Sequence, residues 1–241
     1  MIKLINEDIE SSRNIFEILN QIKKILLTIV KKEFNNNQKL IDFVIKRVSG
    51  ARSVITRQTK IHLTDDEIRE WIPSTKAIEG LSRRIKIKSL DNKETYIMTR
   101  SSEEDYHYMT SVSRYRIKCT CWDSIYTSSI ADKKLFNMMK QSDIDIHQHD
   151  TVFSRYSICK HTIASISRAI HMGYLDINDN ELLNTLRLSL LGAYLRVEEK
   201  PDKELVLKLV SRLLYNTPYA RNIYPWRNQE LEIIENENNI I

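Results

Sequence analysis

The chain has 241 residues, of which 41% are hydrophobic and 29% charged, the balance of a globular protein with room for a sizeable core. No stretch approaches the roughly 20 uninterrupted apolar residues that span a bilayer, and no apolar block resembles a signal peptide. The odd number of cysteines argues against a disulfide framework. We therefore expect an intracellular protein without membrane partners, located in the cytoplasm or, in a eukaryote, in the nucleus. The four glycines lie too far apart for a P-loop or a dinucleotide-binding turn, and no HExxH, GxSxG or kinase signature occurs, so we expect no enzyme.

Charge is distributed unevenly along the chain. The net charge is +5, yet residues 1–100 hold 20 Lys and Arg against 13 Asp and Glu, whereas residues 179–241 hold 8 against 10. A basic N-terminal part makes a polyanionic partner plausible. Many solvated protein surfaces carry a similar excess of basic residues. The charge alone therefore does not show that the protein binds a polyanion.

The first predicted element is a helix over about residues 7–34. Its apolar residues recur with a 4,3,4,3 spacing that places them on one stripe: Ile15, Leu19, Ile22, Leu26 and Ile29. The stripe favours a seam packed within the chain over a dimerisation zipper. After three asparagines, a second helix is predicted over 38–48, and a capping box at Thr64 and Glu67 predicts a short third helix.

Near residue 84 the pattern changes from helical to alternating. Strands are predicted at 84–88 and 94–99, joined as a hairpin through the turn residues 90–93, and further strands at 106–110 and 114–119. These segments predict a small antiparallel sheet between about residues 83 and 120.

Helical patterns return in the second half of the chain. Helices are predicted at 128–140 and at 160–171, the latter ended by Gly173, and two more at 179–197 and 202–215 form a predicted antiparallel hairpin. The predicted fold class is therefore α+β, a mostly helical chain around a small antiparallel sheet.

All three cysteines fall in two short motifs, Cys119-Thr120-Cys121 and Cys159-Lys160-His161. Three thiolates and one imidazole are the ligand set of a closed, tetrahedral structural zinc site. We therefore predict zinc as a cofactor, bound by Cys119, Cys121, Cys159 and His161. His147 and His149 form an HxH pair, for which two interpretations stay open. The pair is either a second metal site or a replacement for His161, or it is two solvated histidines in a polar loop, which is the commoner situation.

The residues around these ligands resemble the SWIM zinc finger, a ββα module with a CxC pair, a spacer and a CxH pair that leads into an apolar helix. Residues 114–123 and 157–166 carry the resemblance, which covers about 85–171. The spacer, residues 122–158, is longer than is usual for the family. The helix at 128–140 is therefore predicted to loop out from the finger as an insertion.

With this resemblance the chain divides into four predicted regions. They are a helical region at 1–82, a SWIM-like domain at 83–175 that contains the insertion, a helical hairpin at 176–226 and a polar, acidic tail at 227–241.

Among SWIM-containing proteins the chain looks most like the Shu-complex group of eukaryotes and archaea, because the 118 residues before Cys119 are too few for an ATPase or a transposase domain. The resemblance implies a non-enzymatic protein that binds DNA and a protein partner, such as a recombinase paralogue, in recombination, repair or DNA handling. Two alternatives stay open: an interaction adaptor whose binding surface is the hairpin at 179–215, and an accessory protein of a virus or mobile element.

Six basic residues on the even faces of two predicted strands form what we call the basic plate: Arg84, Lys86, Lys88, Arg114, Arg116 and Lys118. Side chains at this spacing can follow a phosphate backbone, which predicts sequence-independent binding of single- or double-stranded DNA. Tyr106, Tyr108 and Trp122 lie close by and are candidates to stack on unpaired bases, although aromatic residues of a small sheet are more often core.

Overall fold

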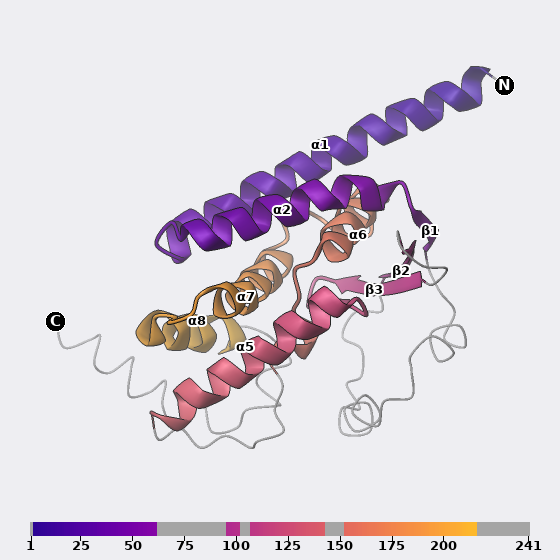
Figure 1. Cartoon of the computed structure of the whole chain (residues 1–241). Helices are drawn as coiled ribbons and strands as arrows, with labels where there is room; N and C mark the ends of the chain where they lie inside the picture. The colour runs from indigo at the N-terminus through magenta and orange to yellow at the C-terminus, as the bar shows by residue number, and fades with distance from the viewer. Residues whose placement is uncertain (1, 62–94, 102–106, 143–151, 216–241) are drawn as a thin grey trace.

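The computed structural model of the protein describes residues 2–61, 95–101, 107–142 and 152–215 (Figure 1). These parts form an α+β fold, as predicted. The helices are α1 (Ile2–Glu33), α2 (Gln38–Ile55), α5 (Trp122–Lys140), α6 (Lys160–His171), α7 (Asn180–Val197) and α8 (Lys203–Tyr215), with a 3-10 turn η1 (Phe153–Arg155). The strands are β1 (Gln58–Ile61), β2 (Thr95–Arg100), β3 (His107–Ser113) and β4 (Arg116–Cys119). None of the helices in this described part is both long and apolar enough to cross a membrane.

The four strands form one antiparallel sheet in the order β1-β2-β3-β4. Three of them fall where alternation predicts them. β1 was not predicted, and it pairs with β2 over Ile97–Thr99, while β3 takes the other edge. Because a strand has only two edges, the predicted hairpin cannot pair residues 84–88 with Ile97–Thr99. Residues 84–88 themselves lie outside the described residues, as does the predicted short helix after Thr64.

The predicted seam of α1 is confirmed as an intramolecular one. All five residues of the stripe from Ile15 to Ile29 are buried within the chain. The helix packs on α2 and α6 more than on α7, so its main cover is not the C-terminal hairpin. Asn35 and Asn36 turn the chain with φ of 51° and 53°, and the Asn37 side chain accepts a hydrogen bond from the Leu40 amide at 2.9 Å to begin α2.

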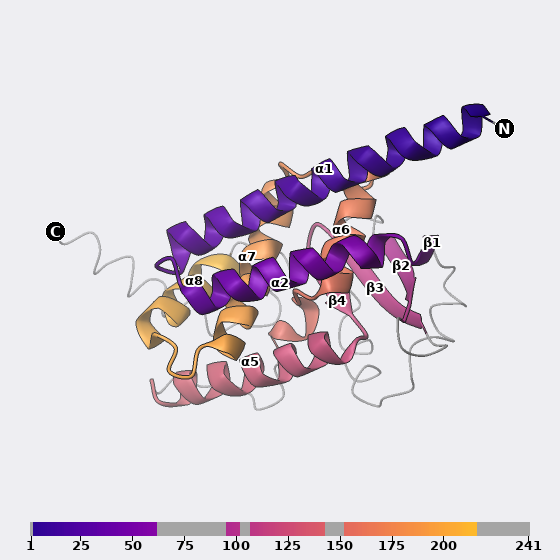
Figure 2. The same cartoon turned by 45° about the horizontal axis from the view of Figure 1, so that its top comes forward.

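Helix α6 lies between the sheet and the pair of α1 and α2 (Figure 2). Eight of its twelve residues are buried, and the Ser165 hydroxyl lies 2.6 Å from that of Thr110 in β3. The helix ends as predicted at Gly173, which has φ +75°. Because both sides of α6 are covered, its N-terminus is held firmly in place.

Helix α7 is an interior helix. Its buried residues lie all round the axis, from Leu182 to Leu195, and α1, α2, α5, α8 and β4 pack on it. A helix that is apolar on all sides belongs in a core. The hairpin of α7 and α8 thus contributes core packing through α7, and only α8 has a solvent-exposed face.

Helix α5 begins at Trp122, directly after the ligand Cys121, and packs against α7 and η1. The predicted helix at 128–140 is therefore longer than expected, beginning at Trp122, and it packs in the core of the protein. Its inner face begins with Ser124 and Thr127, whose polar side chains hid the start of the buried stripe. Both side chains are small enough to let the first turns of α5 pack closely on the neighbouring helix.

Candidate metal centre

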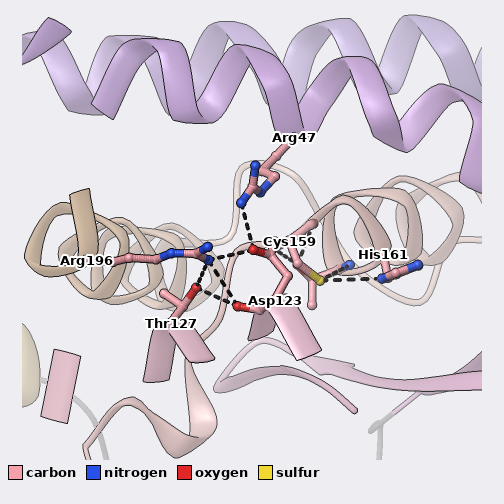
Figure 3. A network of polar contacts seen from close by, with 7 residues as sticks. Arg47, Asp123, Thr127, Cys159, His161 and Arg196 are labelled. Carbon is pink, nitrogen blue, oxygen red and sulfur yellow. Dashed lines mark hydrogen bonds and ion pairs between the residues drawn. The ribbon is translucent and has the colours of Figure 1, made fainter. Parts of the chain in front are cut away.

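The structure brings together the four predicted ligands from three elements. Cys119 ends β4, Cys121 is the N-cap of α5, Cys159 is the N-cap of α6, and His161 lies in the first turn of α6. All four side chains are buried, and their ligand atoms lie within 4.8 Å of one another. The Cys159 sulfur is 3.9 Å from Nδ1 of His161, and Figure 3 shows these two side chains pointing toward each other. The cluster is compact enough to hold one metal ion.

Two of the sulfur atoms accept hydrogen bonds from backbone amides, which stabilise negative charge on sulfur. The Cys121 amide donates to Sγ of Cys119 at 3.3 Å, and the Thr162 amide donates to Sγ of Cys159 at 3.4 Å. Helices α5 and α6 both begin at the cluster, so the positive ends of two helix dipoles face the thiols. Both effects favour thiolate, which is the form that binds a metal.

Before any metal binds, the thiols differ in acidity. Burial raises the pKa of the Cys119 thiol well above its ordinary value. Burial acts in the same direction on Cys159, yet hydrogen bonds from Cys119, Cys121 and His161 together outweigh it and hold the pKa of Cys159 well below its ordinary value. A single thiolate shared by its neighbours is thus favoured, and a bound cation would supply the charge that deprotonates the others.

The Tyr108 ring covers the imidazole of the site. The ring centroids of Tyr108 and His161 are 4.6 Å apart at 43°, and Tyr108 packs on the three cysteines. Of the three aromatic residues considered for base stacking, Tyr108 therefore serves the core, as is usual in a small sheet. Tyr106 lies outside the described residues, and Trp122 is 74% exposed.

Only part of the basic plate lies in the described residues. Arg116 and Lys118 alternate in β4 with the buried Ile117 and Cys119, so they lie on the face opposite the ligand, as predicted. Arg114 belongs to the turn before β4, and its guanidinium forms an ion pair with Asp179, the N-cap of α7. Arg84, Lys86 and Lys88, and the histidines His147 and His149, lie outside the described residues.

A charged network that the sequence does not predict lies beside the Cys3His cluster. Asp123, in the first turn of α5, accepts from Arg47 of α2 at 2.7 Å and from Arg196 of α7 at 2.5 Å (Figure 3). Arg196 also donates to the Thr127 hydroxyl at 2.6 Å. The three charged residues lie so far apart in the sequence that no spacing could reveal the network.

Comparison with known proteins adds no relative. No protein family, curated protein or solved structure matches the chain. The functional conclusions therefore rest on the Cys3His cluster and its surroundings.

Proposed function

We propose that the protein is a non-enzymatic zinc protein in which the ion ties β4, α5 and α6 together. The buried Cys3His cluster carries this proposal, because three thiolates and one imidazole match the preference of zinc. A tetrahedral ion with four protein ligands has no open position for a catalytic water. The role expected of it is structural.

The placing of the ligands supports a SWIM-like finger. A CxC pair at the end of a strand and a CxH pair at the start of an apolar helix are the arrangement that the resemblance implies. The departure is α5, which begins at the second cysteine and belongs to the core. We therefore propose a SWIM-like site whose spacer has become part of the scaffold.

The proposed activity is contact with DNA and with a protein partner, in recombination, repair or DNA handling. The DNA contact is supported by the basic excess of residues 1–100 and by the placing of Arg116 and Lys118 on the face of β4 opposite the buried Ile117 and Cys119. The partner, a recombinase paralogue in this proposal, rests on the SWIM resemblance alone.

Metal analysis of the purified protein tests the zinc site. We expect about one zinc per chain, lost in His161→Ala and retained in the matched variant His171→Ala, whose histidine lies at the other end of α6. Zinc that persists after all three cysteines are replaced by serine would overturn the assignment and direct attention to His147 and His149.

A salt series of DNA binding tests the activity. Replacing Arg116 and Lys118 together with Gln should leave zinc bound, lower DNA affinity and flatten the slope of log affinity against log salt by roughly 0.7 to 0.9 for each phosphate that the variant no longer neutralises. Lys208→Gln, an exposed lysine of α8, is the control and should change little. If the unaltered protein shows no salt-sensitive binding to DNA, the adaptor alternative replaces this proposal.

A further inference from the structure

Exposed apolar side chains gather at the start of α5. In the described part of the chain the exposed large hydrophobic residues are Ile45, Trp122, Ile125, Tyr126 and Met172. Three of the five, Trp122 at 74%, Ile125 at 50% and Tyr126 at 45% exposure, follow the i, i+3, i+4 spacing of a single helix face. A cluster of this kind marks an interaction site, whereas single exposed residues do not.

Two of these residues present flat aromatic surfaces. The rings of Trp122 and Tyr126, which we call the aromatic pair, are near-parallel, with 20° between their planes and 6.2 Å between their centroids. Aromatic rings lose little conformational entropy on binding, and every nucleic-acid base has a π-face that can stack on them.

A network of charged side chains with an excess of arginine lies next to the aromatic pair. The guanidinium of Arg196 lies 5.1 Å from the centroid of the Tyr126 ring, and Arg196 and Arg47 share the single carboxylate of Asp123. Two positive charges against one negative charge leave an excess of one within the network of Arg47, Asp123 and Arg196. The positive end of the α5 dipole adds to it.

A partner that fits this surface offers a flat π-system together with negative charge. We propose that the aromatic pair binds unpaired bases of single-stranded nucleic acid, whose backbone continues toward Lys118 and Arg116 on β4. This inference rests on the proposed DNA contact and names its strandedness and its binding site. Trp122 follows Lys118 by four residues, so the Cα atoms of these two residues lie within about 14 Å of each other.

The metal cluster gives this surface its fixed shape. Only Thr120 and Cys121 separate β4 from α5, and Cys119 and Cys121 on either side of Thr120 are both ligands. A bound ion would therefore hold the end of the basic strand and the start of the aromatic helix at a constant separation. Preorganisation of this kind reduces the entropy cost of binding.

The test compares a 16-nucleotide oligo(dT) with a duplex of the same length. In a variant whose only tryptophan is Trp122, made with Trp71→Phe and Trp226→Phe, we expect oligo(dT) to quench the fluorescence and the duplex to leave it nearly unchanged. Trp122→Ala should weaken oligo(dT) binding about 10-fold, the loss typical of one stacked base, with an unchanged salt slope and unchanged duplex affinity. Trp122→Phe should restore most of the affinity.

Controls separate this inference from the proposed function. Met172→Ala, which removes an apolar side chain of 44% exposure at the end of α6, should change neither affinity. If Trp122→Ala leaves oligo(dT) binding intact while the Arg116 and Lys118 variant weakens it, the aromatic pair is overturned as a base platform and the proposed function stands. If the protein binds neither nucleic acid, both fail. A concentration-dependent dimer that Trp122→Ala dissociates, with DNA affinity unchanged, would make the surface an interface between two copies of the chain and overturn the inference.

Discussion

Gly192 of α7 faces the ring of Phe153 so closely that a Cβ atom on it would lie 2.9 Å from Cδ1 of the ring. Phe153 is fully buried at the start of the segment that leads to the ligand Cys159. Its amide donates to Asp132 at 2.8 Å, its carbonyl accepts from Ser128 at 2.8 Å, and further along the Ser157 amide donates to the Ile117 carbonyl of β4 at 2.8 Å. The core therefore positions this ligand-bearing segment independently of any metal.

Gly192→Ala should destabilise the protein although alanine is the better helix former. The added methyl group would overpack the contact with Phe153, which costs about 1–3 kcal/mol in a well-packed core. Urea unfolding measures the loss, and Phe153→Leu should reduce the cost of the glycine substitution in the double variant. An unchanged midpoint for Gly192→Ala would show that the ring moves aside freely.

Gly173→Ala is the matched comparison, because this substitution should destabilise the protein for a different physical reason. No atom lies within 4 Å of the Cβ position there, but φ is +75°, so the substitution should cost about 1–2 kcal/mol through backbone strain alone. Phe153→Leu should leave that cost unaltered.

Removal of the proposed zinc ion by a chelator should loosen the Cys3His site without unfolding the protein. One continuous hydrophobic cluster runs through α1, α2, α6, α7 and α8, so most of the helical structure does not depend on the ligands. We expect far-UV circular dichroism to change little. The amides of Cys121 and Thr162, which donate to ligand sulfurs, should exchange with solvent much faster after chelation. Cooperative loss of the helices would contradict this view, since it would mean that folding depends on the ion as in small zinc fingers.

The ligand set was predictable because its chemistry is local to two tripeptides. Cysteine and histidine at spacing two, with alternation that turns Cys119 inward and an apolar helix after His161, point to one cluster without any knowledge of the fold. The helices α1 and α6 were predictable for a similar reason, since a buried stripe repeats within each of them.

The remaining features depend on contacts between distant parts of the chain. β1 is a four-residue strand with no alternation of its own, and it forms because β2 offers it an edge. The packing of α5 on α7 and η1, and the close approach of Phe153 to Gly192, likewise connect residues far apart in the sequence. The pairing of Arg114 with Asp179 likewise follows from tertiary packing.

Asp132 makes the stability of the fold depend on pH. Burial raises the pKa of its carboxyl group to about 7, although the Phe153 amide donates to it. Between the ordinary carboxyl pKa, about 4, and pH 7 the folded chain therefore holds a proton that the unfolded chain has lost, so this group's contribution to stability falls as the pH rises. Asp132→Asn keeps an oxygen acceptor and carries no charge. Its advantage in free energy of unfolding over the unaltered protein should grow from pH 5 to pH 8, and an advantage that stays constant with pH would refute the assignment.

Deleting residues 1–34 should cause the remaining chain to aggregate. Five fully or almost fully buried side chains of α1 cover α2 and α6, and each contributes about 1.5–3 kcal/mol of burial: Ile15, Leu19, Ile22, Leu26 and Ile29. Their removal would expose a continuous apolar face, which light scattering and size-exclusion chromatography would detect. Glu33→Gln is the control: it breaks the ion pairs of Glu33 with Arg187, at 2.7 Å, and Arg212, at 2.6 Å, but keeps the apolar stripe. Since such partly exposed pairs contribute about 1 kcal/mol or less, this variant should remain monodisperse. A soluble, monodisperse truncation would show instead that α1 is an arm, which the rest of the fold does not need.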